Sequence, residues 1–167
     1  MGPNGVACRE GAPEHPWIER DPNDAPAESS APCPLCAGDG GEVLWRGDYC
    51  RVVLPAEPQW PGLCRVVAGG HAAEMSDLSA PARAAVWAAL HATEQVIRER
   101  LRPDKVNLAS LGNRVEHVHW HLVPRWRDDA CFPGSPWSPP LRTAPVRRLP
   151  RDFAAVARRL LAAALGG

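Results

Sequence analysis

The sequence lacks a net charge and any long apolar run. Its 19 Lys and Arg residues balance 19 Asp and Glu residues over 167 positions, so no broad positive field can recruit nucleic acid or an anionic membrane. No stretch approaches the roughly 20 apolar residues of a membrane span, and the N-terminus lacks the basic start and apolar core of a signal peptide. We therefore expect a cytoplasmic protein without a nucleic-acid or membrane partner.

Closely spaced cysteines are also scarce. Of six cysteines, only Cys33 and Cys36 lie near each other in sequence. In a reducing compartment such a pair favours a metal ion over a disulfide, and flanking Pro and Gly residues are typical of a knuckle that turns both thiolates toward one ion. Two buried thiols without a metal remain the alternative.

The chain is long enough for one domain with a real core, since 45% of its residues are hydrophobic. Residues 1–32 differ from the rest because they contain six prolines, scattered charge and no apolar periodicity. Such a segment cannot bury enough surface to offset its ordering entropy. We expect a flexible N-terminal tail over residues 1–32, followed by the folded part of the chain.

Hydrophobic patterning predicts an α+β fold. Apolar spacings of three and four predict a long helix that begins after Ser79 and ends near Arg100, and Asp152 is expected to cap a final helix. Residues 127–150, rich in Pro, Asp and Arg, should form an irregular segment, which we call the strap. Five strands forming an antiparallel sheet are expected at residues 42–45, 49–54, 63–67, 106–111 and 117–126.

Three histidines alternate with apolar residues in the last of these strands. His117, His119 and His121 would share one face, roughly 6 to 7 Å apart, while the apolar residues between them join the core. A row of three imidazoles needs a metal ion, a phosphate or a proton to justify its desolvation. A single metal bound by all three is the rival interpretation, although alternate residues on a flat strand converge poorly on one ion.

The motif from His117 to Val123 resembles the signature of the histidine triad (HIT) family of nucleotide hydrolases and transferases. The similarity extends from about Cys33 to Trp137 and is greatest to bacterial diadenosine polyphosphate hydrolases. It implies a HIT-like catalytic domain over residues 33–137. Residues 138–167 fall outside the resemblance and are expected to form the rest of the strap and a C-terminal helix. It also implies a homodimer.

The resemblance implies that the protein cleaves the α-phosphate linkage of a small nucleotide. His119 would be the nucleophile that forms a nucleotidyl-histidine, and neutral imidazole is indeed nucleophilic at pH 7. His121 would donate to a phosphate oxygen. Asn107, expected beside the histidine row by antiparallel pairing, would hold phosphate through its amide, unless it only satisfies backbone groups at a strand edge.

The resemblance also implies a structural zinc ion and no organic cofactor. Zinc-bearing family members, and their relatives the galactose-1-phosphate uridylyltransferases, carry a tetrahedral site that corresponds here to Cys33, Cys36, His71 and His117. Four protein ligands leave no open position, so this zinc would pin the knuckle to the histidine strand and would not activate water.

Two features depart from the family pattern. The loop before His117 is about one residue shorter, and Arg114 stands where a small hydroxyl residue usually contacts phosphate. We expect Asn113 and Arg114 to bind substrate, with the arginine suited to a longer polyphosphate chain. Trp126 and Trp137 on the strap could either pack or stack on a base.

Two other functions remain open from the sequence. One is nucleotidyl transfer, in which phosphate or a sugar phosphate replaces water as the acceptor. The other is a non-enzymatic, zinc-stapled nucleotide-binding module. Both would use the same residues as the hydrolase.

Overall fold

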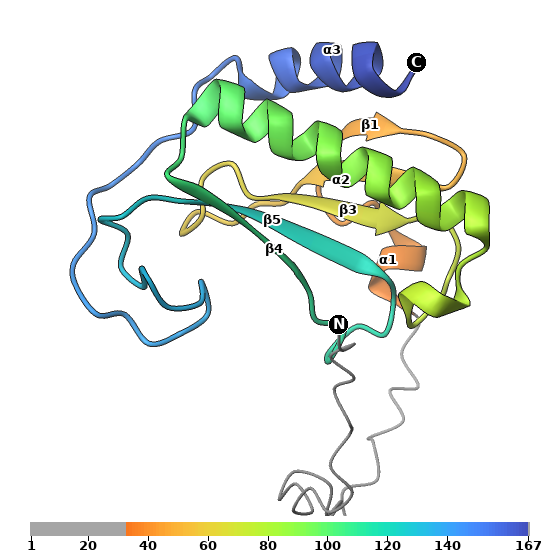
Figure 1. The fold of residues 1–167 in the computed structure, drawn as a ribbon, viewed down its shortest axis with the longest axis horizontal. Coiled ribbons are helices and arrows are strands. Elements are labelled where there is room, and N and C mark those ends of the chain that lie inside the picture. Colours follow the sequence, from red (N-terminus) through yellow and green to blue (C-terminus); the bar gives the residue numbers. More distant parts are fainter. Residues whose placement is uncertain (1–32, 167) are drawn as a thin grey trace, which may run out of the picture. The chain divides into compact units, whose positions relative to one another are not determined.

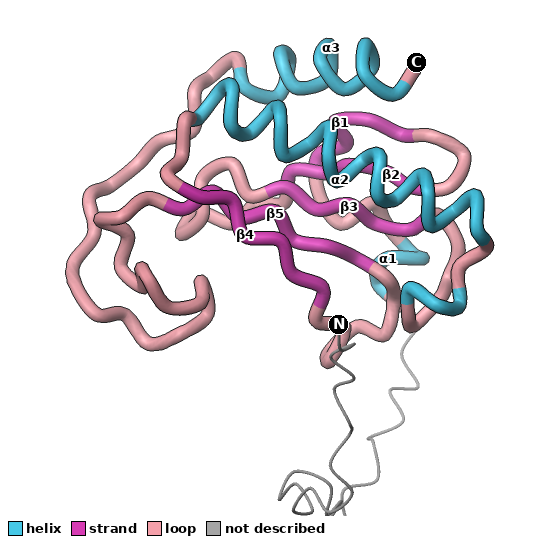
Figure 2. The backbone as a smooth tube through the Cα atoms, in the orientation of Figure 1, coloured by secondary structure: helices cyan, strands magenta, loops and turns pink. Residues whose placement is uncertain are grey.

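The computed structural model describes residues 33–166, so the expected N-terminal tail lies outside the described residues. Five strands form one antiparallel sheet in the order β1-β2-β3-β5-β4. This arrangement confirms the α+β fold (Figures 1 and 2). The strands are β1 (Glu42–Arg46), β2 (Cys50–Leu54), β3 (Cys64–Ala68), β4 (Lys105–Ser110) and β5 (His119–Arg125); the helices are α1 (Pro34–Ala37), α2 (Ala80–Leu101), α3 (Phe153–Leu165) and a short 3-10 turn, η1 (Met75–Asp77).

The main core lies between one face of the sheet and helices α2 and α3. Helix α2 lies over strands β2, β3 and β5 (Figure 1), and α3 packs beside it over β1. The predicted helix positions Val86, Leu90 and Ile97 are buried against Val66 and Leu122 of the central strands. Because side chains alternate along each strand, the residues between these apolar positions face away from the helices.

The opposite face of the sheet is covered at only part of its length. Residues 33–41, which contain α1 and which we call the knuckle, pack on this face through Leu35. Leu35 joins Val53 and Val67 in a second small cluster. The strap begins beyond the end of β5 and contains no helix or strand, as its composition predicted. The residues of β5 that face away from the helices therefore lie between the knuckle and the strap.

The histidine strand begins later than predicted. We expected a strand over residues 117–126, but β5 begins at His119. The N–H of His117 donates to the carbonyl of Val115, and the N–H of Val118 donates to Ala72. These bonds use the backbone donors that a longer strand would need for pairing. His117 therefore precedes the strand, so the expected flat row of three histidines is reduced to two.

The start of α3 also differs from the prediction. Ser79 caps α2 as expected, because its side chain accepts from the N–H of Ala82. Asp152 makes no such side-chain bond at α3. Its carboxylate accepts instead from Arg100 at 2.9 Å, which turns it away from the helix backbone. No helix within residues 33–166 is long and apolar enough to cross a membrane.

The two helix starts provide a matched test. Ser79→Ala should lower the free energy of unfolding by about 1 kcal/mol, since an N–H of the first turn loses its acceptor. Asp152→Ala should cost about 0.5 kcal/mol or less, because only an exposed ion pair is lost. Urea denaturation followed by circular dichroism measures both values, and equal losses would contradict the assigned contacts.

Candidate active site and metal cluster

His119 and His121 lie side by side on the face of β5 that points away from α2, which we call the open face. This strand is hydrogen-bonded on both edges, with β3 on one side and β4 on the other. The two imidazole centroids are 5.1 Å apart. Val67 of β3 lies opposite His119, whereas Arg65 lies opposite His121. The two histidines therefore share a face but have different neighbours.

The ring of His119 is oriented by the backbone just before it. Its Nδ1 lies 2.6 Å from the carbonyl oxygen of His117. A carbonyl can only accept, so Nδ1 must donate its proton and Nε2 keeps a free lone pair. This is the state of imidazole that can attack an electrophile.

The ring of His121 is held by a side chain of the neighbouring strand. Arg65 Nε donates to His121 Nδ1 at 3.4 Å, and Trp137 of the strap makes an edge contact at 5.4 Å between ring centroids. Burial, together with the smaller effects of Arg65 and His119, lowers the pKa of His121 to about 4. His121 is therefore neutral at pH 7.

His117 points away from these two rings, into a cluster with Cys33, Cys36 and His71. The ligand atoms of all four residues lie within 4.8 Å of one another. His117 Nε2 donates to the carbonyl of Ala68 at 3.0 Å, so its Nδ1 presents a lone pair to the two thiols. Burial lowers the pKa of His117, which favours the neutral ring that a metal needs.

The spacing within this cluster suits a tetrahedral ion. His117 Nδ1 lies 3.5 Å from each sulfur, and His71 Nδ1 lies 3.4 Å from Cys36 Sγ. Bonds of about 2.0 Å to nitrogen and 2.3 Å to sulfur in a tetrahedron separate such ligand atoms by about 3.5 Å. The cluster could hold a metal ion. Among residues 33–166, it is the one such group found, and it includes only His117 of the three histidines.

Arg51 fastens the knuckle to the sheet. Its buried guanidinium donates to the carbonyls of Leu35, Gly38 and Asp39 at 2.7 to 3.0 Å. These carbonyls lie on both sides of Cys36 in the sequence, so the arginine holds this turn to β2. Burial lowers the pKa of Arg51 from its ordinary value, and nearby Arg46 adds to this effect.

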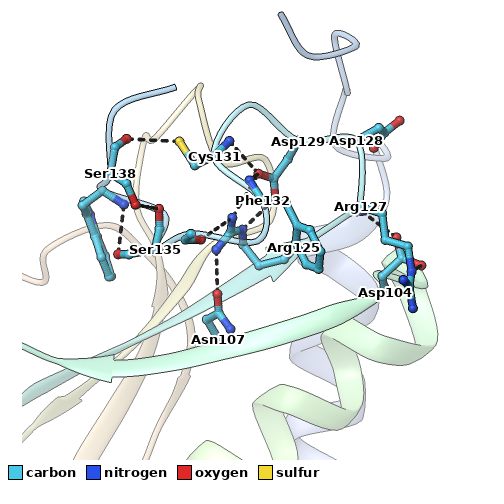
Figure 3. A network of polar contacts seen from close by, with 12 residues as sticks. Asp104, Asn107, Arg125, Arg127, Asp128, Asp129, Cys131, Phe132, Ser135 and Ser138 are labelled. Atoms are coloured by element: carbon cyan, nitrogen blue, oxygen red, sulfur yellow. Dashed lines mark hydrogen bonds and ion pairs between the residues drawn. The ribbon is translucent and has the colours of Figure 1, made fainter. Parts of the chain in front are cut away.

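At the other end of β5, Arg125 ties the strap to the sheet (Figure 3). This residue is 1% exposed and makes a two-point ion pair with Asp129, at 2.7 and 3.0 Å. It also donates to Asn107 Oδ1 at 2.7 Å and to the carbonyl of Gly134 at 3.1 Å. Burial by itself would raise the pKa of Asp129, but the bonds from Arg125 and from two backbone N–H groups outweigh it and lower that pKa.

Asn107 lies beside the histidines as antiparallel pairing predicted. Asn107 pairs with Val123, which lies two residues after His121 on β5. Residues two apart on a strand point to the same face, so the side chain of Asn107 lies on the face of the histidines. Arg125 occupies its amide oxygen, and the NH₂ group therefore remains as the donor. Asn113 and Arg114 lie exposed on the loop that leads from β4 toward His119.

Known proteins resemble this chain in sequence and in fold. Residues 40–128 match the family model described as the HIT domain. The chain belongs to the HIT family. A protein from Mycobacterium tuberculosis named AP-4-A phosphorylase is 32% identical over 123 residues, which cover 69% of this chain and 63% of that protein.

Solved structures show the same fold at lower identity. A histidine triad protein from Bradyrhizobium japonicum superposes with a TM-score of 0.59 at 20% identity and covers 76% of this chain and 92% of its own. One from Marinobacter aquaeolei VT8 gives 0.57 at 24% identity, with coverage of 78% and 92%. Within this HIT protein, Cys33, Cys36 and the strap from Asp129 onward lie outside the family match.

Sequence reasoning missed three arginines around the site. Arg51 and Arg65 sit within otherwise apolar strands, and Arg125 ends the histidine strand. A charged residue between buried neighbours needs a polar partner. The arginines within these apolar strands were therefore a sign that such partners exist. The partners themselves come from distant segments, so the pattern alone could not name them.

The Arg125–Asp129 pair generates a stability prediction. Asp129→Asn should lower the free energy of unfolding by about 3 kcal/mol, since it leaves a buried guanidinium without its counter-charge. Because the folded-state pKa of Asp129 is lowered, its contribution is fully present above about pH 4 and is lost as pH falls through that folded-state pKa. Urea denaturation at pH 7 and at pH 3 measures both effects.

The adjacent residue supplies the control. Asp128 pairs with Arg147 on the surface, so Asp128→Asn should cost about 0.5 kcal/mol or less. Equal losses of unfolding free energy for the two variants at pH 7 would show that the buried pair stabilises the fold no more than the surface pair does.

Proposed function

We propose that this HIT protein transfers a nucleotidyl group through His119. The observation that carries the proposal is the complementary state of two neighbouring rings. His119 Nε2 presents a lone pair, because its Nδ1 donates to the carbonyl of His117. His121 Nε2 carries the proton of a neutral ring, because its Nδ1 accepts from Arg65. A nucleophile and a donor thus stand 5.1 Å apart, between ring centroids, on one face.

In the first step, His119 Nε2 attacks the α-phosphorus of a dinucleoside polyphosphate or related nucleotide conjugate. A nitrogen–phosphorus bond forms and the bond to the bridging oxygen breaks, so that the remaining phosphate chain leaves as an anion. The ring becomes positively charged, and the carbonyl of His117 stabilises it through the Nδ1 proton. His121 donates to an α-phosphate oxygen, where charge develops in the transition state.

Asn107, Asn113 and Arg114 are proposed to hold the substrate. Arg125 occupies the amide oxygen of Asn107, so the free NH₂ group is available to donate to phosphate. Asn113 and Arg114 lie exposed on the loop before β5, within one loop of His119. An arginine there suits a polyphosphate chain, which it can bind with two parallel bonds.

The second step passes the nucleotidyl group to an acceptor. Hydrolysis, with water as the acceptor, is our first proposal. Phosphorolysis is the second candidate, supported by the name of the mycobacterial relative, of which this chain spans 63%. Product analysis separates them, since diadenosine tetraphosphate yields AMP with water but ADP when phosphate accepts the adenylyl group. Added phosphate that leaves the products unchanged would favour hydrolysis.

Zinc is the proposed ion of the cluster formed by Cys33, Cys36, His71 and His117. Two sulfur and two nitrogen donors are a typical structural zinc set, and the lone pair of His117 already faces both thiols. When bound, the ion would supply a rigid crosslink between the knuckle and the backbone that precedes His119. The ligands leave no open position for water.

A homodimer is proposed together with this function. Strand β4 is an edge of the sheet, and it exposes Leu108, while Leu111 follows it at 50% exposure. Trp87 of α2 is 52% exposed as well. Unpaired strand edges that carry apolar side chains are usually covered, and a second copy would cover this one.

We propose a cytoplasmic location.

The covalent intermediate is directly testable. Millisecond reactions with diadenosine tetraphosphate, quenched and examined by intact-protein mass spectrometry, should contain a transient adduct of one adenosine monophosphate. His119→Ala should lose both the adduct and turnover, by at least about 10³-fold. His91→Ala changes an exposed histidine on α2 and is the matched control. Substrate binding without turnover by the wild-type protein would favour the non-enzymatic module.

The metal proposal has its own test. Cys36→Ser should reduce bound zinc in the purified protein from about one ion per chain to less than about 0.1, measured by inductively coupled plasma mass spectrometry. Cys131→Ser is the control, because Cys131 lies in the strap and donates to the carbonyl of Ser138, a bond that a hydroxyl can replace. Equal zinc content in the two variants would exclude the proposed ligand set.

A further inference from the structure

Arg65 is the one charged side chain that contacts His121 from a neighbouring strand among residues 33–166. The two residues are direct partners in the pairing of β3 with β5, and Arg65 Nε donates to His121 Nδ1 at 3.4 Å. The other end of the guanidinium makes an ion pair with Glu57 at 2.7 Å. Both partners are largely buried, with 21% and 29% of their side chains exposed. The arginine is therefore held from both ends.

The chemistry of this contact is one-directional. A guanidinium has only donors, so the ring nitrogen that faces it must accept. A neutral imidazole carries one proton, which then has to sit on Nε2. We propose that Arg65 is a positioning residue that holds His121 in the neutral tautomer with its proton on Nε2, directed at the substrate phosphate. The inference rests on the proposed function, in which His121 donates to a phosphate oxygen.

The neighbouring histidine shows why such a device is needed. His119 and His121 occupy equivalent positions on one strand, but they need opposite states at Nε2: a lone pair on the first and a proton on the second. A backbone carbonyl at Nδ1 imposes the lone pair on His119. An arginine at Nδ1 imposes the proton on His121. Arg65 is thus the element that makes two similar side chains chemically different.

The other groups around His121 do not provide this distinction. From β5 itself, His119 faces it at 5.1 Å between centroids. Strand β4 places Ala109 opposite, and the strap contributes Trp137; neither of these titrates. Glu57 reaches the site only through Arg65. Removing the arginine therefore removes both the donor at Nδ1 and the positive charge that disfavours a protonated ring.

The first experiment observes the ring nitrogens directly in the free protein. Long-range ¹H–¹⁵N correlation spectra, assigned by comparison with His121→Gln, should show Nδ1 of His121 unprotonated and Nε2 protonated at pH 7. Arg65→Met should give a mixture of tautomers and move the midpoint of the His121 titration upward, because loss of a positive charge favours the protonated ring. Arg65→Lys, which keeps a charged donor, should retain most of the wild-type tautomer.

Kinetics then test the consequence. Arg65→Met should lower kcat at pH 7 by roughly tenfold, less than the 10²–10³ for loss of a whole donor, and should leave KM within about twofold. Because a doubly protonated imidazole also carries a proton on Nε2, the ratio of wild-type to Arg65→Met activity should fall toward acid pH. Arg100→Met is the matched control, because the Arg100 side chain is 30% exposed and pairs with Asp152 at the end of α2 instead of with a histidine.

Each outcome is distinguishable from failure of the proposed function. A protonated Nδ1 on His121 in the wild-type protein would overturn the inference without any variant, even if Arg65→Met does not fold. An unchanged tautomer and midpoint in a folded Arg65→Met would overturn it as well. If the spectra change as expected but wild-type His119 never acquires a nucleotidyl group, the proposed function fails while the pairing of Arg65 with His121 stands.

Discussion

The site depends on the hydrogen bonding of β5 along both of its edges. Strand β5 lies between β3 and β4, so its backbone N–H and C=O groups are hydrogen-bonded on both sides. This pairing determines which residues of the neighbouring strands lie opposite each β5 side chain. One face contributes Leu122 to the core under α2, and the other carries His119 and His121. A one-residue change in register would exchange these faces. The apolar contacts of the core therefore also determine where the two imidazoles point.

Three histidines close together in sequence acquire three different chemical states from their partners. A carbonyl at Nε2 turns the lone pair of His117 toward two thiols. A carbonyl at Nδ1 leaves a lone pair on His119 Nε2, and an arginine at Nδ1 leaves a proton on His121 Nε2. The imidazole side chains are identical, so the differences arise entirely from which ring nitrogen meets a donor or an acceptor.

Both ends of the open face are secured by a buried arginine rather than by regular structure. Arg51 gathers three carbonyls of the knuckle, and Arg125 joins Asn107 to the strap through Asp129 (Figure 3). An irregular segment lacks its own ladder of backbone bonds, and a guanidinium with five donors can satisfy several acceptors at once. The strap places Trp137 against His121 by this means.

The sequence by itself determined the antiparallel sheet and the long helix after Ser79, and its resemblance to the HIT family indicated the residues of the two candidate sites. These features depend on local periodicity and on short motifs, which can be read along the chain. It did not predict that β5 begins only at His119, or that Asp152 pairs with Arg100 instead of capping α3. It also missed Arg51, Arg65 and Arg125. Each of these depends on a partner that lies far away in sequence and near only after folding, so tertiary structure alone decided them.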